Sequence, residues 1–208
     1  MNNILIVAAT AAEIAPLLEE EKKGRVNNID FLITGVGMVA TAFALGKKLQ
    51  EKRYDLAINL GIGGSFNRSL SLGDVVFVKE DNFSELGAED GDAFLPITQL
   101  GFGKNQYKSE ISNLAQEWIK DLKPVSGITV NTVHGNDSQI SRLLHIWPAD
   151  IESMEGAAFY YACEQEQIPC VQVRSISNYI EKRNRENWKI GLAIKVLNDW
   201  VLSKMTLT

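Results

Sequence analysis

The chain has 208 residues, of which 45% are hydrophobic and 23% are charged, and its formal net charge is -5. This length suits one domain with a full core (residues 1–208), and the acidic balance leaves no electrostatic footprint for binding nucleic acid. The apolar run at residues 4–12 is too short to span a bilayer and lacks the basic start of a signal peptide, so we expect a cytoplasmic protein that does not bind membranes.

Short apolar strands alternate with amphipathic helices over the first half of the chain. The predicted strands are Asn3–Ala9, Ile29–Val36, Asp55–Gly64 and Gly73–Val78. The predicted helices are Ala11–Lys23 and Met38–Lys52. The segment Asp81–Tyr107 is rich in Gly, Asp and Phe, which predicts a long irregular loop.

The same alternation continues over the second half of the chain. The predicted helices are Lys108–Leu122, Asp137–Leu144, Glu155–Glu166 and Asn187–Lys204, and the predicted strands are Gly127–Val133 and Cys170–Asn178. Continuous apolar strands between helices indicate a three-layer α/β/α domain with a mixed, mostly parallel central sheet. Ligands bind such sheets at the carboxyl ends of the strands, so we look for chemistry there.

The first predicted strand is followed by Thr10 and Glu13. Thr-x-x-Glu at a helix start is the pattern of a capping box, in which the glutamate reaches back to the threonine. A glutamate that faces a cleft could instead act as a general base. The local pattern leaves both interpretations open.

Glycine-rich turns follow the next two strands, at Gly35-Val36-Gly37 and at Gly61-Ile62-Gly63-Gly64. Glycine allows backbone N–H groups to approach a ligand, but it also forms ordinary tight turns. Neither run is a dinucleotide-binding fingerprint and no P-loop occurs, so we expect no nucleotide cofactor.

Met154 and Glu155 come just before an alanine-rich helix. An acid in this place interacts favourably with the helix dipole, but it could also accept hydrogen bonds from the two hydroxyls of a ribose. Methionine is most often a core residue, although it could also supply an apolar contact for a sugar or a base.

Alternation along the strand Cys170–Asn178 places Gln172, Arg174, Ile176 and Asn178 on one face. A buried arginine needs an ion pair or a ligand. Asn178 taken alone is most often a turn residue that ends the strand, but it could also contact a ligand.

The cysteines and histidines offer no metal site. Cys163 and Cys170 form no CxxC motif, so we expect reduced structural thiols. His134 and His145 are too few and too loosely spaced for zinc. We therefore expect neither a metal nor a cofactor.

Five motifs in one order, spread over almost the whole chain, resemble those of the purine nucleoside phosphorylase superfamily. They are ILIVAATAAEIAPL, ITGVGMVATAFAL, DLAINLGIGGSFNRSLSLGDVVFV, DIESMEGAAFYYAC and VRSISN. The nucleosidase branch, which includes methylthioadenosine/S-adenosylhomocysteine nucleosidase, is the most similar. The stretches IESMEGAAFYYAC and VRSISNYIEKRNRENWKI resemble the versions found in the futalosine hydrolase family, which releases hypoxanthine from futalosine in an alternative menaquinone pathway.

The resemblance implies a catalytic and binding set. Glu13 would activate water, Met154 and Glu155 would hold the ribose, and Asn178 would contact the base where adenine-specific nucleosidases carry aspartate. Further residues that it places at the substrate are Gly61, Ile62, Gly63, Val133, His134, Arg174 and Ser177. Ile62 occupies a position that is often polar in relatives, so a hydroxyl contact is missing there.

The resemblance also implies a basic group for the carboxylate-bearing tail at the 5′ side of futalosine. Arg183, Arg185 and Lys189 are the candidates, although a solvated charged helix start is the more common explanation for each of them. The superfamily usually forms homodimers or larger homo-oligomers, and Phe94 and Phe102 in the irregular segment could serve such an interface. We expect a small nucleoside as the binding partner.

Asn178 predicts which purine is released. Its amide can donate to the O6 atom of a 6-oxopurine and accept from a protonated N7, whereas an ionised aspartate only accepts. This favours hypoxanthine-type over adenine-type substrates.

Two other functions are weighed against hydrolysis. A phosphorylase needs arginines near the first glycine loop, yet the first arginine of the chain is Arg25, and Glu13 would repel an anion. A protein that only binds nucleosides needs no catalytic set, whereas Glu13, Glu155 and Asn178 are all present.

Overall fold

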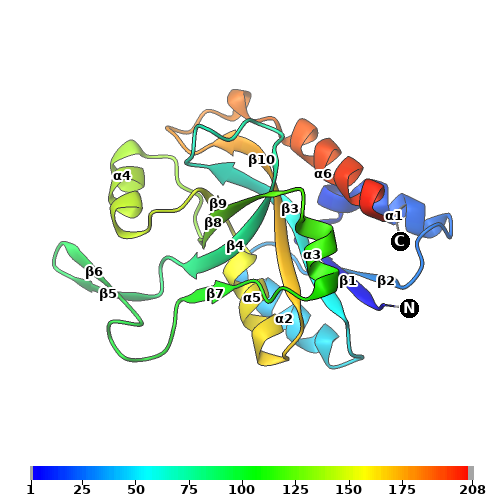
Figure 1. The fold of residues 1–208 in the computed structure, drawn as a ribbon. Coiled ribbons are helices and arrows are strands. Elements are labelled where there is room, and N and C mark those ends of the chain that lie inside the picture. Colours follow the sequence, from blue (N-terminus) through cyan, green and yellow to red (C-terminus); the bar gives the residue numbers. More distant parts are fainter. Residues whose placement is uncertain (1, 206–208) are drawn as a thin grey trace.

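A mixed sheet with helices on both faces forms the centre of the protein in the computed structural model, which describes residues 2–205 (Figure 1). The strands are β1 Ile4–Ala8, β2 Ile29–Ile33, β3 Leu56–Ser65, β4 Val75–Phe83, β5 Gly87–Asp90, β6 Ala93–Pro96, β7 Gln106–Lys108, β8 Lys123–Thr129, β9 Ile151–Ser153 and β10 Cys170–Tyr179. The helices are α1 Ala15–Lys22, α2 Met38–Leu49, α3 Asn113–Ile119, α4 Asp137–Ile146, α5 Gly156–Gln165 and α6 Ile190–Met205, with 3-10 turns η1 Ala11–Ile14 and η2 Arg185–Asn187. No helix within residues 2–205 combines the length and the apolar character needed to cross a lipid bilayer.

The sheet closes on itself through its longest strands. Its order is β10-β4-β8-β9-β3-β1-β2, with β7 beside β4, and β10 also pairs with β3. The pairs β10–β4, β3–β9 and β4–β7 are antiparallel, and the pairs β1–β2, β1–β3, β10–β3, β4–β8 and β8–β9 are parallel. The predicted α/β architecture with a mixed, mostly parallel sheet is therefore confirmed.

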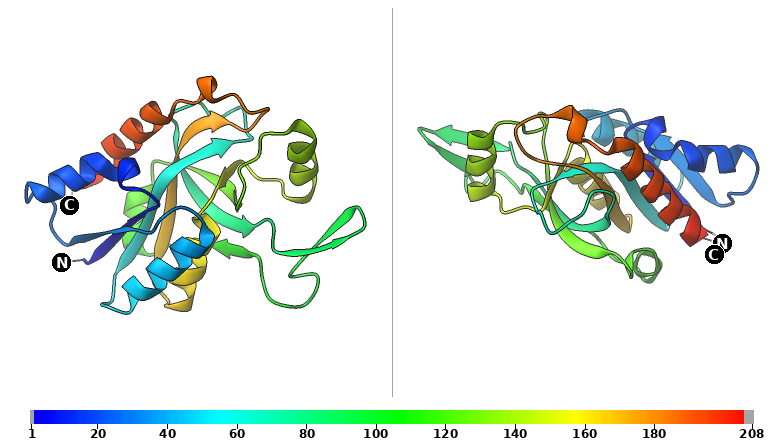
Figure 2. Two further views of the ribbon diagram at one scale, coloured as in Figure 1. Left: turned by 180° about the vertical axis from the view of Figure 1, so that it is seen from behind. Right: turned by 90° about the horizontal axis from the view of Figure 1, so that it is seen from above.

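The apolar run of β1 serves two cores, one on each face of the sheet. In β1, Ile4 and Ile6 join a cluster with buried residues of α1, α3 and α6, while Leu5 and Val7 join one with α2 and α5. Figures 1 and 2 show α1 and α6 on one side of the sheet and α2 and α5 on the other. A strand buried on both faces has no polar alternation, which explains why β1 reads as continuously apolar.

The first helix is shorter than predicted. The segment Ala11–Ile14 forms a 3-10 turn, and α1 starts only at Ala15, with a proline in its first turn. Pro16 has no N–H, so it fits where helical N–H groups lack partners anyway and marks a new helix start.

The prediction of an irregular loop over Asp81–Tyr107 was wrong. This segment contains the end of β4, the β5–β6 hairpin and β7, and the hairpin projects from the body of the protein (Figures 1 and 2). Gly91 has a φ of 60° in the two-residue turn of the hairpin, a conformation that glycine adopts easily. Phe94 packs edge-to-face on Trp147 with ring centroids 6.3 Å apart, whereas Phe102 is exposed.

Two further elements have other boundaries than predicted, and one short strand was not predicted. The helix expected at Lys108–Leu122 covers only Asn113–Ile119, because Ser112 caps it by accepting from the N–H of Ala115. The strand expected at Gly127–Val133 is Lys123–Thr129, which leaves Val133 in a loop. The three-residue strand β9 was not predicted, because so short an element has no periodicity to detect.

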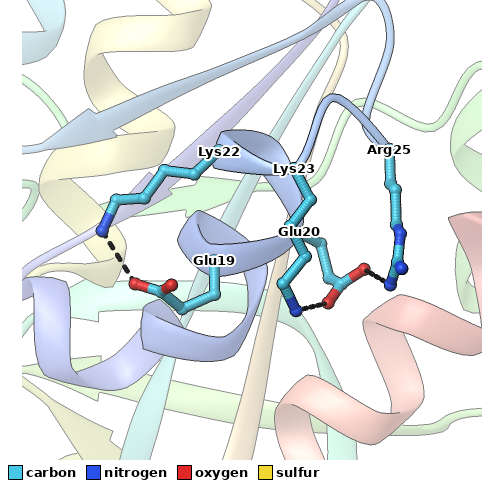
Figure 3. Close-up of polar contacts among 5 residues, drawn as sticks. All are labelled: Glu19, Glu20, Lys22, Lys23 and Arg25. Carbon is cyan, nitrogen blue, oxygen red and sulfur yellow. Dashed lines mark hydrogen bonds and ion pairs between the residues drawn. The ribbon is translucent and has the colours of Figure 1, made fainter.

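The exposed end of α1 carries three ion pairs (Figure 3). Lys22 lies 2.7 Å from Glu19, Lys23 lies 2.7 Å from Glu20, and Arg25 lies 3.0 Å from the other oxygen of Glu20. Exposed pairs of this kind contribute about 0.2–1 kcal/mol each. Their main consequence is that Arg25 is already paired with a carboxylate.

A buried aspartate links three strands and the start of α5. Asp81 accepts from the Thr129 hydroxyl at 2.8 Å and from Gln172 Nε2 at 3.0 Å, and the N–H of Ala157 donates to Thr129 Oγ1. A Cβ on Gly156 would lie 2.1 Å from Asp81 Oδ2, so only glycine fits there. Burial raises the pKa of Asp81 to about 6, against the lowering effect of its hydrogen bonds.

The raised pKa of Asp81 predicts a pH-dependent cost to stability. The native state binds the Asp81 proton more tightly than the unfolded state does, so the wild-type protein loses up to roughly 3 kcal/mol as the pH rises from about 4 to above 6. An Asp81→Asn variant avoids this loss, because its amide stays neutral and can donate to Gln172 Oε1 once that amide turns over. Urea unfolding of both proteins between pH 4 and pH 8 measures the difference.

The control is Asp92→Asn, which changes an exposed aspartate in the β5–β6 turn. Its free energy of unfolding should depend on pH in the same way as that of the wild-type protein. If the free energy of unfolding depends on pH equally in Asp81→Asn and in the wild-type protein, Asp81 is not the source of the pH dependence.

Candidate active site

A cavity of about 320 Å³ opens at the carboxyl ends of β1, β3 and β10, beside β9. Nine of the residues proposed from the sequence line it: Glu13, Ile62, Gly63, Val133, His134, Met154, Glu155, Ser177 and Asn178. The other four, Gly61, Arg174, Arg183 and Arg185, are outside this lining. The strands thus bring together side chains that are up to 165 positions apart in the chain, Glu13 and Asn178 among them.

Glu13 caps a helical turn and lines the cavity at the same time. Its Oε2 accepts from both the backbone N–H and the hydroxyl of Thr10, each at 3.0 Å. Its Oε1 accepts from the N–H of Ile62 at 3.2 Å. The α6 residue Asn198 also donates to the carbonyl of Glu13 at 2.8 Å. The two interpretations that the sequence left open are therefore compatible.

Glu155 lies at the N-cap of α5 and is 8% exposed. Its Oε1 accepts from the N–H of Gly37 at 3.0 Å, which leaves lone pairs for a ligand. Burial raises the pKa of Glu155, while the positive charge of Arg174 and the Gly37 hydrogen bond lower it and Glu13 raises it further. The result is a desolvated carboxylate with a cation nearby.

Arg174 lies behind the cavity wall and not in it. Its guanidinium donates to Asn59 Oδ1, and at 3.2 Å to the carbonyl of Val173. A Cβ on Gly61 would lie 3.3 Å from Arg174 Nη1 and 2.9 Å from Glu13 Oε1, so the arginine and this glutamate approach the same backbone position. Arg174 is buried, but its hydrogen-bond partners are neutral oxygens of the protein, where the sequence led us to expect an ion pair or a ligand.

A β-bulge at Ser177 breaks the alternation predicted for β10. The pairing of β10 with β3 runs to Ile176 opposite Gly63 and resumes with Asn178 opposite Gly64. Ile176 therefore packs in the core, whereas Ser177 and Asn178 both line the cavity. The extra residue in a bulge redirects the side chains that follow it.

The neighbours of Asn178 fix the orientation of its amide. Its Nδ2 donates to the carbonyl of Tyr179 at 3.1 Å, and its Oδ1 accepts from the Ser177 hydroxyl at 2.8 Å. A primary amide has two N–H donors and two lone pairs on its oxygen. One donor and one acceptor of Asn178 therefore remain for a ligand.

Glu152 is a cavity residue that the sequence motifs did not single out. It is 2% exposed, and its two oxygens accept from the N–H of His134 at 2.9 Å and contact His134 Nδ1 at 2.8 Å. The hydrogen bond with Glu152 raises the pKa of His134. Glu152 belongs to the motif DIESMEGAAFYYAC, but its position beside the loop that carries His134 depends on the pairing of β9 in the sheet.

Apolar side chains that the sequence analysis did not single out complete the walls. They are Val36, Ile180, Trp188, Ile190 and Ile194. Arg183 and Arg185 flank the Trp188 ring, with their guanidinium carbons 5.0 Å and 6.0 Å from its centroid. Both arginines are exposed and lie beside a cavity-lining ring. Within residues 2–205, no group of three His, Cys, Asp or Glu side chains is placed to hold a metal ion.

Comparison with known proteins shows the family of the chain. The model of the phosphorylase superfamily matches residues 3–202. The chain belongs to the phosphorylase superfamily. Futalosine hydrolase of Streptomyces coelicolor is 33% identical over 180 residues, covering 83% of this chain and 76% of that protein. A 5′-methylthioadenosine/S-adenosylhomocysteine nucleosidase of Glaesserella parasuis is 28% identical, covering 78% of this chain and 74% of that protein.

The solved structures extend the comparison to the fold of this superfamily member. The native futalosine hydrolase of Helicobacter pylori superposes with a TM-score of 0.83 at 17% identity, covering 99% of this chain and 97% of that chain. The resemblance drawn from the sequence motifs is confirmed. Like these relatives, the protein is a hydrolase of nucleoside N-glycosidic bonds, a purine nucleosidase.

The double role of Glu13 predicts a separable loss of catalysis. Glu13→Gln retains a cap acceptor but removes the carboxylate, so if Glu13 is the general base, kcat should fall by at least about 100-fold while the free purine still binds. Thr10→Ala weakens the cap but keeps the carboxylate, and it should cost kcat much less. Steady-state kinetics with calorimetric base binding measure both variants, and full turnover by Glu13→Gln would leave the residue with capping alone.

Proposed function

We propose that this purine nucleosidase is a futalosine hydrolase, which releases hypoxanthine and dehypoxanthine futalosine in the alternative menaquinone pathway. The observation that carries the proposal is the amide of Asn178, which keeps one donor and one acceptor free at the cavity wall. The name of the Streptomyces coelicolor relative supports it as well.

The first task in the mechanism is to activate water. Cleavage of an N-glycosidic bond develops positive charge on the sugar and negative charge on the leaving purine. Glu13 takes a proton from the attacking water as general base. Three donors from Thr10 and Ile62 orient its carboxylate, so the base is positioned before the substrate arrives.

The second task is to hold the ribose and stabilise its developing charge. Glu155 accepts hydrogen bonds from the ribose hydroxyls, and its buried negative charge stabilises the cationic sugar. Met154 supplies an apolar contact in the same cavity wall.

The third task is to stabilise the departing purine. Asn178 donates to O6 and accepts from the protonated N7 of the base. The carbonyl of Tyr179 holds the amide in this orientation, because turning the amide over would place two acceptors face to face.

Phosphorolysis fits this cavity poorly. The lining of the cavity contains three glutamates, Glu13, Glu152 and Glu155, and neither lysine nor arginine. Arg25, the first arginine of the chain, is paired with Glu20 at the end of α1 (Figure 3). A phosphate dianion would meet like charges where it needs donors.

Exchange of the amide for a carboxylate tests the base preference. The wild-type protein should release hypoxanthine from futalosine without phosphate and act poorly on methylthioadenosine. Asn178→Asp should shift the ratio of kcat/KM values toward the 6-aminopurine substrate by about 10- to 100-fold, because an aspartate accepts from an exocyclic amine. Chromatography of the free bases, with and without phosphate, gives the answer. A requirement for phosphate would refute hydrolysis, and faster release of adenine by the wild-type protein would refute the role of Asn178.

The arginines beside Trp188 fit the acidic tail of futalosine. A joint Arg183→Ala and Arg185→Ala change should raise KM for futalosine about three- to tenfold, because exposed charge pairs contribute modestly. Inosine has no such tail, so its KM should stay the same. Lys182→Ala is the matched control, since Lys182 is an exposed cation in the same loop. An equal rise for both substrates would exclude the arginines as tail contacts.

A further inference from the structure

The mechanism leaves one of the three cavity glutamates without a task. Glu13 activates water and Glu155 holds the ribose, whereas Glu152 is 2% exposed and still lines the cavity. A buried carboxylate is costly unless it is well hydrogen-bonded, so its presence in a largely apolar cavity calls for a function.

Glu152 lies in one row of the sheet with Asn178. Gly64 of β3 pairs with Glu152 of β9 on one side and with Asn178 of β10 on the other. Two strand spacings separate the outer residues by about 10 Å. A Cβ on Gly64 would lie 2.1 Å from Cδ1 of Ile180, so an apolar side chain fills the space between the two polar groups. This arrangement suits the edge of a flat heterocycle that carries polar atoms.

His134 determines what Glu152 can offer a ligand. The carboxylate accepts from the N–H of His134, a donor that would otherwise be free at this wall, and it also contacts Nδ1 of the same residue. An ionised carboxylate only accepts, and its two oxygens hold about four lone pairs. Glu152 therefore occupies the N–H donor of His134 and presents acceptor lone pairs to the cavity in its place.

We propose that Glu152 accepts a hydrogen bond from the N1–H of a 6-oxopurine and is a second specificity residue beside Asn178. This inference rests on the proposed function, since it assumes that a purine occupies the cavity. A 6-oxopurine carries a hydrogen at N1, whereas a 6-aminopurine presents a lone pair there, which would face the carboxylate unfavourably. Asn178 then reads O6 and N7, and Glu152 reads N1.

The first test compares two substrates that differ only at the purine edge, futalosine and its 6-amino analogue. Glu152→Gln should lower kcat/KM for futalosine by about 10- to 100-fold, because the amide can turn its N–H toward N1. The 6-amino analogue should lose nothing or gain, since its N1 accepts from that N–H. An equal loss for both substrates would overturn the inference and make Glu152 a support for the His134 loop.

The matched control is Glu85→Gln. Glu85 is an exposed glutamate that accepts from Asn131 and whose charge raises the pKa of His134 from outside the cavity. It should leave the ratio between the two substrates unchanged. If Glu85→Gln shifts the ratio of the two kcat/KM values as much as Glu152→Gln does, the effect comes from charge near His134 and the inference is overturned.

A second measurement needs no variant. Calorimetry should show that the wild-type protein binds hypoxanthine at least about tenfold more tightly than 1-methylhypoxanthine, which keeps O6 and N7 but lacks the N1 hydrogen. Glu152→Ala should bring the two affinities close together, because it removes the acceptor and makes room for the methyl group. Equal affinities in the wild-type protein would overturn the inference. A wild-type protein that cleaves neither futalosine nor its 6-amino analogue would overturn the proposed function instead, and the calorimetry would still decide the role of Glu152.

Discussion

The end of β3 has to pass through a space that leaves no room for side chains, and the site depends on this constraint. A Cβ on Gly61 would lie 2.9 Å from Glu13 Oε1, and one on Gly64 would lie 2.1 Å from Ile180 Cδ1. The bare backbone lets β3 pair with β1, β9 and β10 and still donate the N–H of Ile62 to Glu13. Residues from four distant parts of the chain therefore meet around one strand end.

The charges of the site follow from the same crowding. The guanidinium of Arg174 lies behind Gly61 and lowers the pKa of the desolvated Glu155, while Glu13 raises it. The cation favours the ionised form of the carboxylate, and an ionised carboxylate stabilises a developing positive charge better in a poorly solvated site than in water, because water does not screen it there. In the proposed mechanism Arg174 would act on Glu155 through the cavity wall, since it lies outside the cavity lining.

The sequence predicted the layers of the fold and nine of the residues that line the cavity, because both depend on local signals. Apolar strand runs, amphipathic helices and the position of Glu13, Glu155 and Asn178 at strand ends can be read without the third dimension. The family motifs then supplied the roles that are proposed for these residues, and the superfamily model matches residues 3–202.

Other features depend on pairing between distant strands and could not be read from local pattern. The bulge at Ser177 exists because β10 shifts register against β3, which no alternation within β10 reveals. Glu152 faces the cavity because β9 adds three residues to the sheet, and Arg174 is held by Asn59 on the neighbouring strand. The β5–β6 hairpin could have been predicted, since Gly91-Asp92 between two short segments is a turn signal.

The capping role of Glu13 has a consequence for attempts to make the protein more robust. The carboxylate of Glu13 closes the first turn after β1 and is also proposed to activate water. Thermal stability and turnover would therefore both depend on this side chain. Substitutions that tighten this turn would act directly on the catalytic step. Engineering for thermal tolerance is better directed to Asp81, where a buried charge weakens the fold at neutral pH and lies outside the cavity lining.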